Sequence, residues 1–127
     1  MFKKDYVMRL IQEAVRAIVK LLFNVDTDKT EELVFNENER ETTYDELLKL
    51  INDGKINEAE NKLLDELDSE DMECYKMALM FYSYLNEKDI DFLEEHDYSK
   101  NEIIDGLKYV SDLYGYGSIA GALLNVL

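Results

Sequence analysis

The sequence predicts an all-α protein, an irregular array or bundle of five to seven helices. Apolar residues recur every three to four positions in several segments, and no alternating apolar and polar run extends beyond a few residues. The chain contains no proline, where average usage would give about six, so long helices can continue without interruption. A hydrophobic content of 46% favours a folded core, and 127 residues is a typical length for one domain spanning residues 1–127.

Residues 2–23 form the most clearly amphipathic helix. The apolar stripe consists of Tyr6 or Val7, Leu10, Ile11, Ala14, Val15, Ile18, Leu21 and Leu22, with charged residues on the opposite face. Three interpretations are open: packing onto the domain's own core, self-association through the stripe, and binding of this basic helix to an anionic membrane. We favour the first, because Glu13 and Arg16 are spaced for an ion pair on an ordinary surface helix.

The segment 24–42 has the weakest pattern. Asp28 and Glu31 are spaced to begin a short helix over residues 29–38, and the polar run 36–42 predicts a loop.

The same segment has part of the spacing of a calcium-binding loop. Loop positions 1, 3, 5, 8 and 12 would be Asp26, Asp28, Thr30, Leu33 and Glu37. Position 6, where the sharp turn needs glycine, is Glu31, and no clear helix follows the loop. We therefore expect no calcium site and no other metal site.

A helical hairpin is predicted over residues 43–68. Thr43 and Glu46 fit a capping box for its first helix, and Gly54 can take the left-handed conformation that ends that helix. Asn57 is a candidate N-cap for the second helix. We expect the small Ala59 to be buried where the two helices meet.

This hairpin resembles one tetratricopeptide repeat, in which a turn glycine is followed by an alanine and then a large apolar residue. Here these residues are Gly54, Ala59 and Leu63. A shift of 34 residues places Lys88 and Leu93 where a second copy would need glycine and alanine, so a strict tandem repeat fails. The resemblance implies an irregular, repeat-like helical fold.

The remaining part, 71–127, begins with a helix over roughly 71–87 that starts at Ser69 or Asp71 and is apolar on nearly every side. Such a helix is typical of the centre of a fold, although its methionines and tyrosines could also line a ligand groove. Cys74 is the only cysteine, and we expect it to be buried, not reactive.

Three shorter helices follow. The first covers residues 89–96, anchored by Ile90 and Leu93. The second begins at the Ser99 and Glu102 capping box, ends near Tyr114 and has a stripe formed by Ile103, Ile104, Leu107, Val110 and Leu113. The third covers residues 118–127, where Gly121 and Ala122 suggest close packing of helices.

Charge is distributed unevenly along the chain. The net charge is −15, yet residues 1–22 carry five basic and two acidic side chains, which leaves −18 on the rest. This acidity argues against nucleic-acid binding and suits a basic protein partner. Charges interrupt the N-terminal apolar run, so we expect neither a signal peptide nor a membrane span, and hence a cytoplasmic protein.

The whole chain also resembles a family of small bacterial proteins of unknown function from the Firmicutes. The resemblance rests on DYVMRLIQEAVRAIVKLLF at Asp5–Phe23 and DGKINEAENKLL at Asp53–Leu64. It implies an all-helical, repeat-like fold, and because the family has no assigned activity, no functional residue is carried over from it.

The residues for most enzymatic sites are missing. The single histidine, His96, lies in the acidic run EEHD, where we expect a solvated surface side chain. We therefore predict no enzyme and no cofactor, but a helical protein-interaction module or, alternatively, a self-assembling or membrane-peripheral protein that uses residues 2–23. The residues chosen as a candidate interaction surface are Leu10, Ile11, Ile18, Tyr75 and Tyr82.

Overall fold

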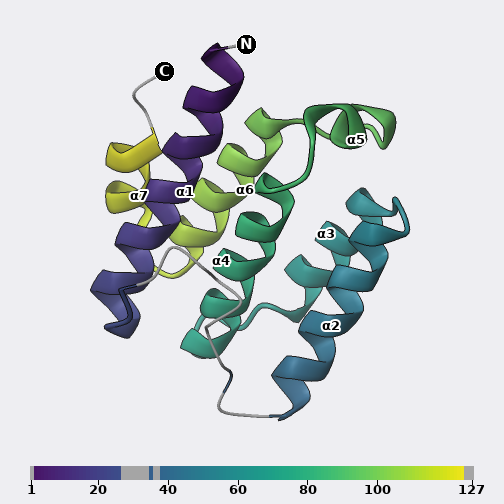
Figure 1. The fold of residues 1–127 in the computed structure, drawn as a ribbon. Coiled ribbons are helices and arrows are strands. Elements are labelled where there is room, and N and C mark those ends of the chain that lie inside the picture. The colour runs from purple at the N-terminus through teal and green to yellow at the C-terminus, as the bar shows by residue number, and fades with distance from the viewer. Residues whose placement is uncertain (1, 27–34, 36–37, 125–127) are drawn as a thin grey trace.

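The computed structural model describes residues 2–26, 35 and 38–124, and within these ranges the chain forms seven helices and no strand (Figure 1). In chain order they are α1 Phe2–Phe23, α2 Asn38–Asn52, α3 Ile56–Glu66, α4 Met72–Asn86, α5 Ile90–Glu95, α6 Lys100–Leu113 and α7 Gly117–Leu124. The predicted all-α fold of five to seven helices is confirmed for this part of the chain. None of these helices is both long and apolar enough to span a bilayer.

Helix α4 is the centre of the fold, as its apolar sequence predicted. Helices α1, α2 and α6 pack against it, and 12 of its 15 residues are buried. Figure 1 shows the α2–α3 hairpin on one side of α4 and helices α1, α6 and α7 on the other. One hydrophobic cluster contains buried residues from every described helix.

Helix α1 packs onto the core of its own chain, which is the interpretation that the sequence favoured. It contacts α4 and α7, and Ile11, Val15 and Ile18 are at most 2% exposed. The predicted stripe is too wide at its edges, because Leu21 is 62% exposed and Tyr6 is 43% exposed. The guanidinium of Arg16, in α1, donates a hydrogen bond of 3.1 Å to Asp26, which follows the helix.

Most residues of the predicted helix over 29–38 and most of the calcium-loop residues lie outside the described residues. Of that loop, Asp26 is described, and it pairs with Arg16 at 3.1 Å and with Lys20 at 3.5 Å. The predicted loop at 36–42 is wrong for residues 38–42, which are the first turns of α2. A polar, exposed helix end still forms there because Glu39 and Glu41 suit the positive end of the helix dipole.

Both predicted helix starts in the hairpin are wrong. Helix α2 begins at Asn38 and not after Thr43, and α3 begins at Ile56 with Lys55 as its N-cap, not Asn57. The Asn57 side chain instead donates a hydrogen bond of 3.4 Å to the Asp97 carbonyl. The predicted turn is confirmed: Gly54 has φ +83°, and the amides of Gly54 and Lys55 bond back to the carbonyls of Ile51 and Leu50, a Schellman motif.

Helices α4 and α6 begin where the sequence predicted, and α5 and α7 each begin one residue from the predicted start, at Ile90 and Gly117. Asp71 caps α4 by accepting from the Glu73 amide, and Ser99 caps α6 by accepting from the Glu102 amide. Two packing predictions fail in this region. Leu113 is 41% exposed, and the small residue buried against the core in α7 is Ala120, whereas Ala122 is exposed.

Candidate functional site: an acidic end and an adjoining pocket

The five residues predicted as an interaction surface do not form one. Ile11, Ile18, Tyr75 and Tyr82 are at most 1% exposed, and Leu10 is partly buried against the same core. These side chains are apolar or aromatic at helical spacing, and that pattern is the same for a core position as for a contact surface. The structure uses them to hold helices together.

Tyr75 and Tyr82 join helices through their hydroxyls, and Tyr75 also does so through its ring. The Tyr75 hydroxyl donates to Ser111 at 2.7 Å, and its ring stacks on Tyr114 with centroids 4.7 Å apart. The Tyr82 hydroxyl donates to the Glu60 carboxylate at 2.7 Å, and Tyr98 donates to the same oxygen at 3.0 Å. Burial and the Glu60 charge raise the pKa of both Tyr82 and Tyr98 well above the usual value, so both hydroxyls stay protonated as donors.

Cys74 is buried, as expected, with its sulfur 3.6 Å from the Glu66 carbonyl. Burial raises the pKa of the thiol, which keeps it protonated at neutral pH. It therefore behaves as a small core side chain.

His96 differs from its predicted role as a solvated surface residue. It is half-buried, its ring lies 4.6 Å from the Phe92 ring, and its Nδ1 donates to the Phe92 carbonyl at 2.8 Å. The ring also occupies the space beside Gly54, where any Cβ would lie only 2.3 Å from His96 Nε2. The absent side chain of Gly54 thus makes room for the histidine that attaches α5 to the α2–α3 turn.

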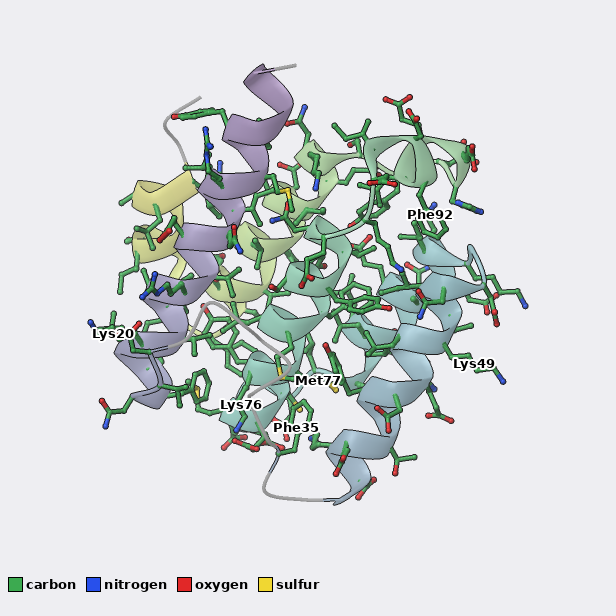
Figure 2. The ribbon with its side chains drawn as sticks, viewed as in Figure 1. Lys20, Phe35, Lys49, Lys76, Met77 and Phe92 are labelled. Atoms are coloured by element: carbon green, nitrogen blue, oxygen red, sulfur yellow. The ribbon has the colours of Figure 1, made fainter. Side chains whose placement is uncertain are left out.

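Further contacts fix α5 at this position. The Lys88 ammonium, just before α5, donates to the Asn52 side chain at 2.6 Å and lies over the rings of Tyr84 and Phe92. On the other side of α5, Asn57 bonds the Asp97 carbonyl. Figure 1 shows α5 beside the turn that joins α2 and α3, and Figure 2 shows Phe92 pointing into the space between them.

This attachment gathers carboxylates at one end of the molecule. Residues 38–71 carry 12 acidic and 4 basic side chains, and residues 87–97 carry 6 acidic side chains and 1 lysine. We define the acidic end as five exposed carboxylates near the α2–α3 turn and the end of α5: Asp53 in the turn, Glu58 at the start of α3, Glu94 and Glu95 in α5, and Asp97 just after it. Because α5 is held against the turn, these carboxylates lie together at one end of the molecule, where Lys55 of the turn is also exposed.

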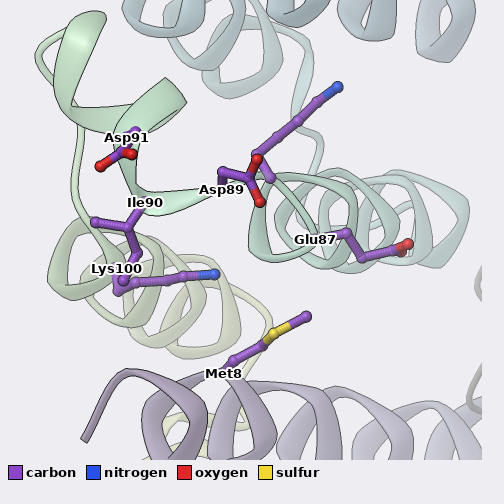
Figure 3. Close-up of a pocket in the computed structure, with 7 residues that line it drawn as sticks. Met8, Glu87, Asp89, Ile90, Asp91 and Lys100 are labelled. Atoms are coloured by element: carbon purple, nitrogen blue, oxygen red, sulfur yellow. The ribbon is translucent and has the colours of Figure 1, made fainter. Parts of the chain in front are cut away.

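A pocket of about 310 Å³ adjoins this end, at the start of α5 (Figure 3). Its walls are Met8 on α1, the run Glu87–Asp91 and Lys100 on α6. The pocket therefore combines both charge signs with apolar groups.

Lys100 is held in the pocket by Asn86, the last residue of α4. Its ammonium donates to the Asn86 backbone carbonyl and, at 3.0 Å, to the Asn86 side-chain oxygen. The Asn86 amide in turn donates to the Met8 carbonyl at 2.9 Å, so three helices meet at this point. Burial lowers the pKa of Lys100 to about 8, and the nearby Asp89 charge opposes that shift.

The sequence did contain a signal for Lys100 that we did not use. A lysine at the first position of α6 opposes the helix dipole, since the N-terminal end of a helix favours negative charge. Such a cost indicates a specific partner elsewhere, which here is the free carbonyl at the end of α4. The role of Glu60 as the acceptor for Tyr82 and Tyr98 was not predictable, because 29 acidic residues gave no basis for choosing one.

The described part of the chain contains no group of three or more histidine, cysteine or carboxylate side chains placed to hold a metal ion. The features above define a small all-α protein organised around one buried helix, with an acidic end and a pocket of mixed charge. The chain belongs to the family described as a family of unknown function (DUF6483), which it matches over residues 1–115. No match was found among curated proteins or solved structures.

Proposed function

We propose that this protein is a non-enzymatic helical interaction module that binds a basic protein segment through its acidic end. The observation that carries the proposal is the placement of α5 against the α2–α3 turn, which joins the carboxylates of two separate acidic segments on one surface. Clustered charge of one sign raises the association rate with an oppositely charged partner and favours one orientation of binding.

The absence of an enzymatic role is part of the same proposal. Histidine is the side chain that most often moves protons at neutral pH, but the His96 ring packs beside Gly54 of the turn, and its Nδ1 bonds the Phe92 carbonyl of α5. Cys74, the only thiol, is buried and protonated. Both arrangements support a structural use of these two side chains.

We further propose that this protein is bacterial and cytoplasmic, and that its α2–α3 hairpin is similar to a tetratricopeptide repeat. The left-handed Gly54 turn and the fully buried Ala59 support the repeat-like hairpin. A single unpaired cysteine suits a reducing compartment. A net charge of −15 speaks against a nucleic-acid partner, and the covered apolar stripe of α1 speaks against a membrane surface.

The test is binding of a fluorescent lysine-rich peptide to the full chain, followed by anisotropy at low and physiological salt. The double variant Glu94→Lys with Glu95→Lys reverses two charges of the acidic end. The control, Glu41→Lys with Asp45→Lys, makes the same change on exposed residues of α2 away from the turn. We expect the first variant to weaken binding at least about tenfold more than the control, since local complementarity adds to net charge.

Equal weakening by the two variants would mean that only the net charge attracts the peptide, and the proposed surface would be wrong. Light scattering of the free protein tests the alternative partner, a second copy of the chain. A concentration-dependent dimer whose formation covers Glu94 and Glu95 would replace the basic partner in this proposal.

A further inference from the structure

The pocket at the start of α5 has two opposite charges that face the same space. Figure 3 shows the Lys100 amine and the Asp89 carboxylate directed toward one volume, with Met8 reaching toward it from α1. The Asp91 carboxylate points away from it. At about 310 Å³ the pocket is at the lower end of the usual size range for small-molecule sites, which is roughly 300–1,000 Å³.

Lys100 keeps a hydrogen-bond donor for a ligand. An ammonium group has three N–H donors, and Lys100 gives two of them to the carbonyl and side-chain oxygens of Asn86. These two bonds fix the direction of the amine, so the remaining donor has a defined orientation. Asn86 is itself fixed by its bond to the Met8 carbonyl, so the position of the Lys100 amine depends on contacts among α1, α4 and α6.

The second lysine of the pocket wall does not supply a competing positive charge. The Lys88 ammonium is bonded to Asn52 and lies 4.9 Å and 5.3 Å from the ring centroids of Tyr84 and Phe92. Among the charged side chains of the pocket wall, the Lys100 amine and the Asp89 carboxylate are the two that Figure 3 shows directed toward this volume. A ligand with both charges can pair with Asp89 and Lys100 at once, whereas a ligand of one sign can pair with only one of them.

We propose that this pocket binds an α-ammonium group together with its adjacent carboxylate or carbonyl oxygen, the chemistry shared by a free amino acid and the first residue of a peptide. The ammonium would bind Asp89, the oxygen would accept from Lys100, and the side chain would lie against Met8 and Ile90. This site is separate from the acidic end, because it uses neither Glu94 nor Glu95.

The experiment is amide NMR of the full ¹⁵N-labelled chain titrated with four probes. Leucine and the dipeptide Leu-Ala have the free ammonium group, whereas N-acetyl-leucine and N-acetyl-Leu-Ala lack it. We expect the first pair to shift the amides of residues 87–91 and 100 saturably and the acetylated pair to leave them unchanged. Tighter binding of leucine than of Leu-Ala would identify a free amino acid as the ligand, and tighter binding of Leu-Ala would identify a peptide N-terminus.

Two isosteric variants test the residue assignment. Asp89→Asn should weaken leucine or Leu-Ala binding at least about tenfold, because it removes a charge-assisted hydrogen bond. Asp91→Asn removes the same charge from the same pocket wall and should change the affinity less than about twofold, since its carboxylate points away. Equal effects of the two variants, equal binding of the acetylated probes, or no saturable shift with any probe would each overturn the proposal. The Glu94→Lys and Glu95→Lys double variant should bind these probes normally, which separates this result from the test of the acidic end.

Discussion

The contact between Gly54 and His96 allows a prediction with an internal control. Gly54→Ala places a Cβ at a residue with φ +83°, and that Cβ would lie 2.3 Å from His96 Nε2 and 2.5 Å from Cδ2. Gly115 occupies the same position of a Schellman motif at the end of α6, with φ +86°, and nothing lies within 4 Å of its Cβ position. Gly115→Ala therefore measures the backbone cost alone.

The two variants should differ by the cost of displacing the histidine. A left-handed alanine costs about 1–2 kcal/mol in the free energy of unfolding, and this cost is common to both variants. At Gly54 the ring must also move, which weakens its 2.8 Å bond to Phe92 and its ring contact and adds about 1–3 kcal/mol. We expect losses of about 1–2 kcal/mol for Gly115→Ala and about 2–5 kcal/mol for Gly54→Ala.

The measurement is urea unfolding followed by circular dichroism at 222 nm. Replacing glycine by alanine lowers the conformational entropy of the unfolded chain equally in both variants, so this effect cancels when the two losses are compared. In a His96→Ala background, the cost of Gly54→Ala should fall to that of Gly115→Ala. The packing argument would be refuted if the two variants lost equal free energy of unfolding in the original background. It would also be refuted if the loss caused by Gly54→Ala were the same with and without His96→Ala.

Three other predictions concern packing and pH. Ala59→Leu should overpack the hairpin and lower the free energy of unfolding by about 1–3 kcal/mol, while Ala122→Leu on the exposed face of α7 should change it little; equal urea midpoints for the two would contradict the burial argument. The pKa of Lys100 is lowered from 10.5 to about 8 in the folded chain, so the charged form of this side chain opposes folding below pH 8. The free energy of unfolding, compared with that of Lys100→Met, should therefore rise between about pH 8 and 10.5. A difference that stays constant across that window in urea titrations would contradict the lowered pKa. Deleting residues 2–23 should expose the faces of α4 and α7 and cause aggregation or early melting, and a truncated chain that light scattering and thermal melts show to be monomeric and stable would contradict the α1 packing.

The helices were predictable because their signals are local. The Ser99 cap, the Gly54 turn and the apolar α4 each follow from a few neighbouring residues, and all three occur as expected. The start of α2 at Asn38 was missed because the local signal, Glu39 and Glu41 in the first turn, is weak in a chain with 29 acidic residues. The Arg40 guanidinium pairs with Asp71 at 2.7 Å, a contact with the start of α4 that local sequence cannot show.

The candidate site was not predictable for a related reason. Asp89, Lys100 and Met8 come from three separate parts of the chain, and their meeting depends on how α1, α4 and α6 pack. Periodicity did identify Ile11 and Tyr82 as apolar positions, but it could not distinguish a buried face from a contact surface. That distinction depends on which helices cover which face.

The packing of α1 against α7 has a consequence for the order of events during synthesis. Helix α1 is complete at Phe23, but the helix that covers part of it begins only at Gly117. Contacts between residues so distant in sequence form late, because a long loop must first close. While the ribosome makes the intervening residues, the apolar face of α1 stays partly uncovered, and this nascent stage is where we expect a need for chaperone protection.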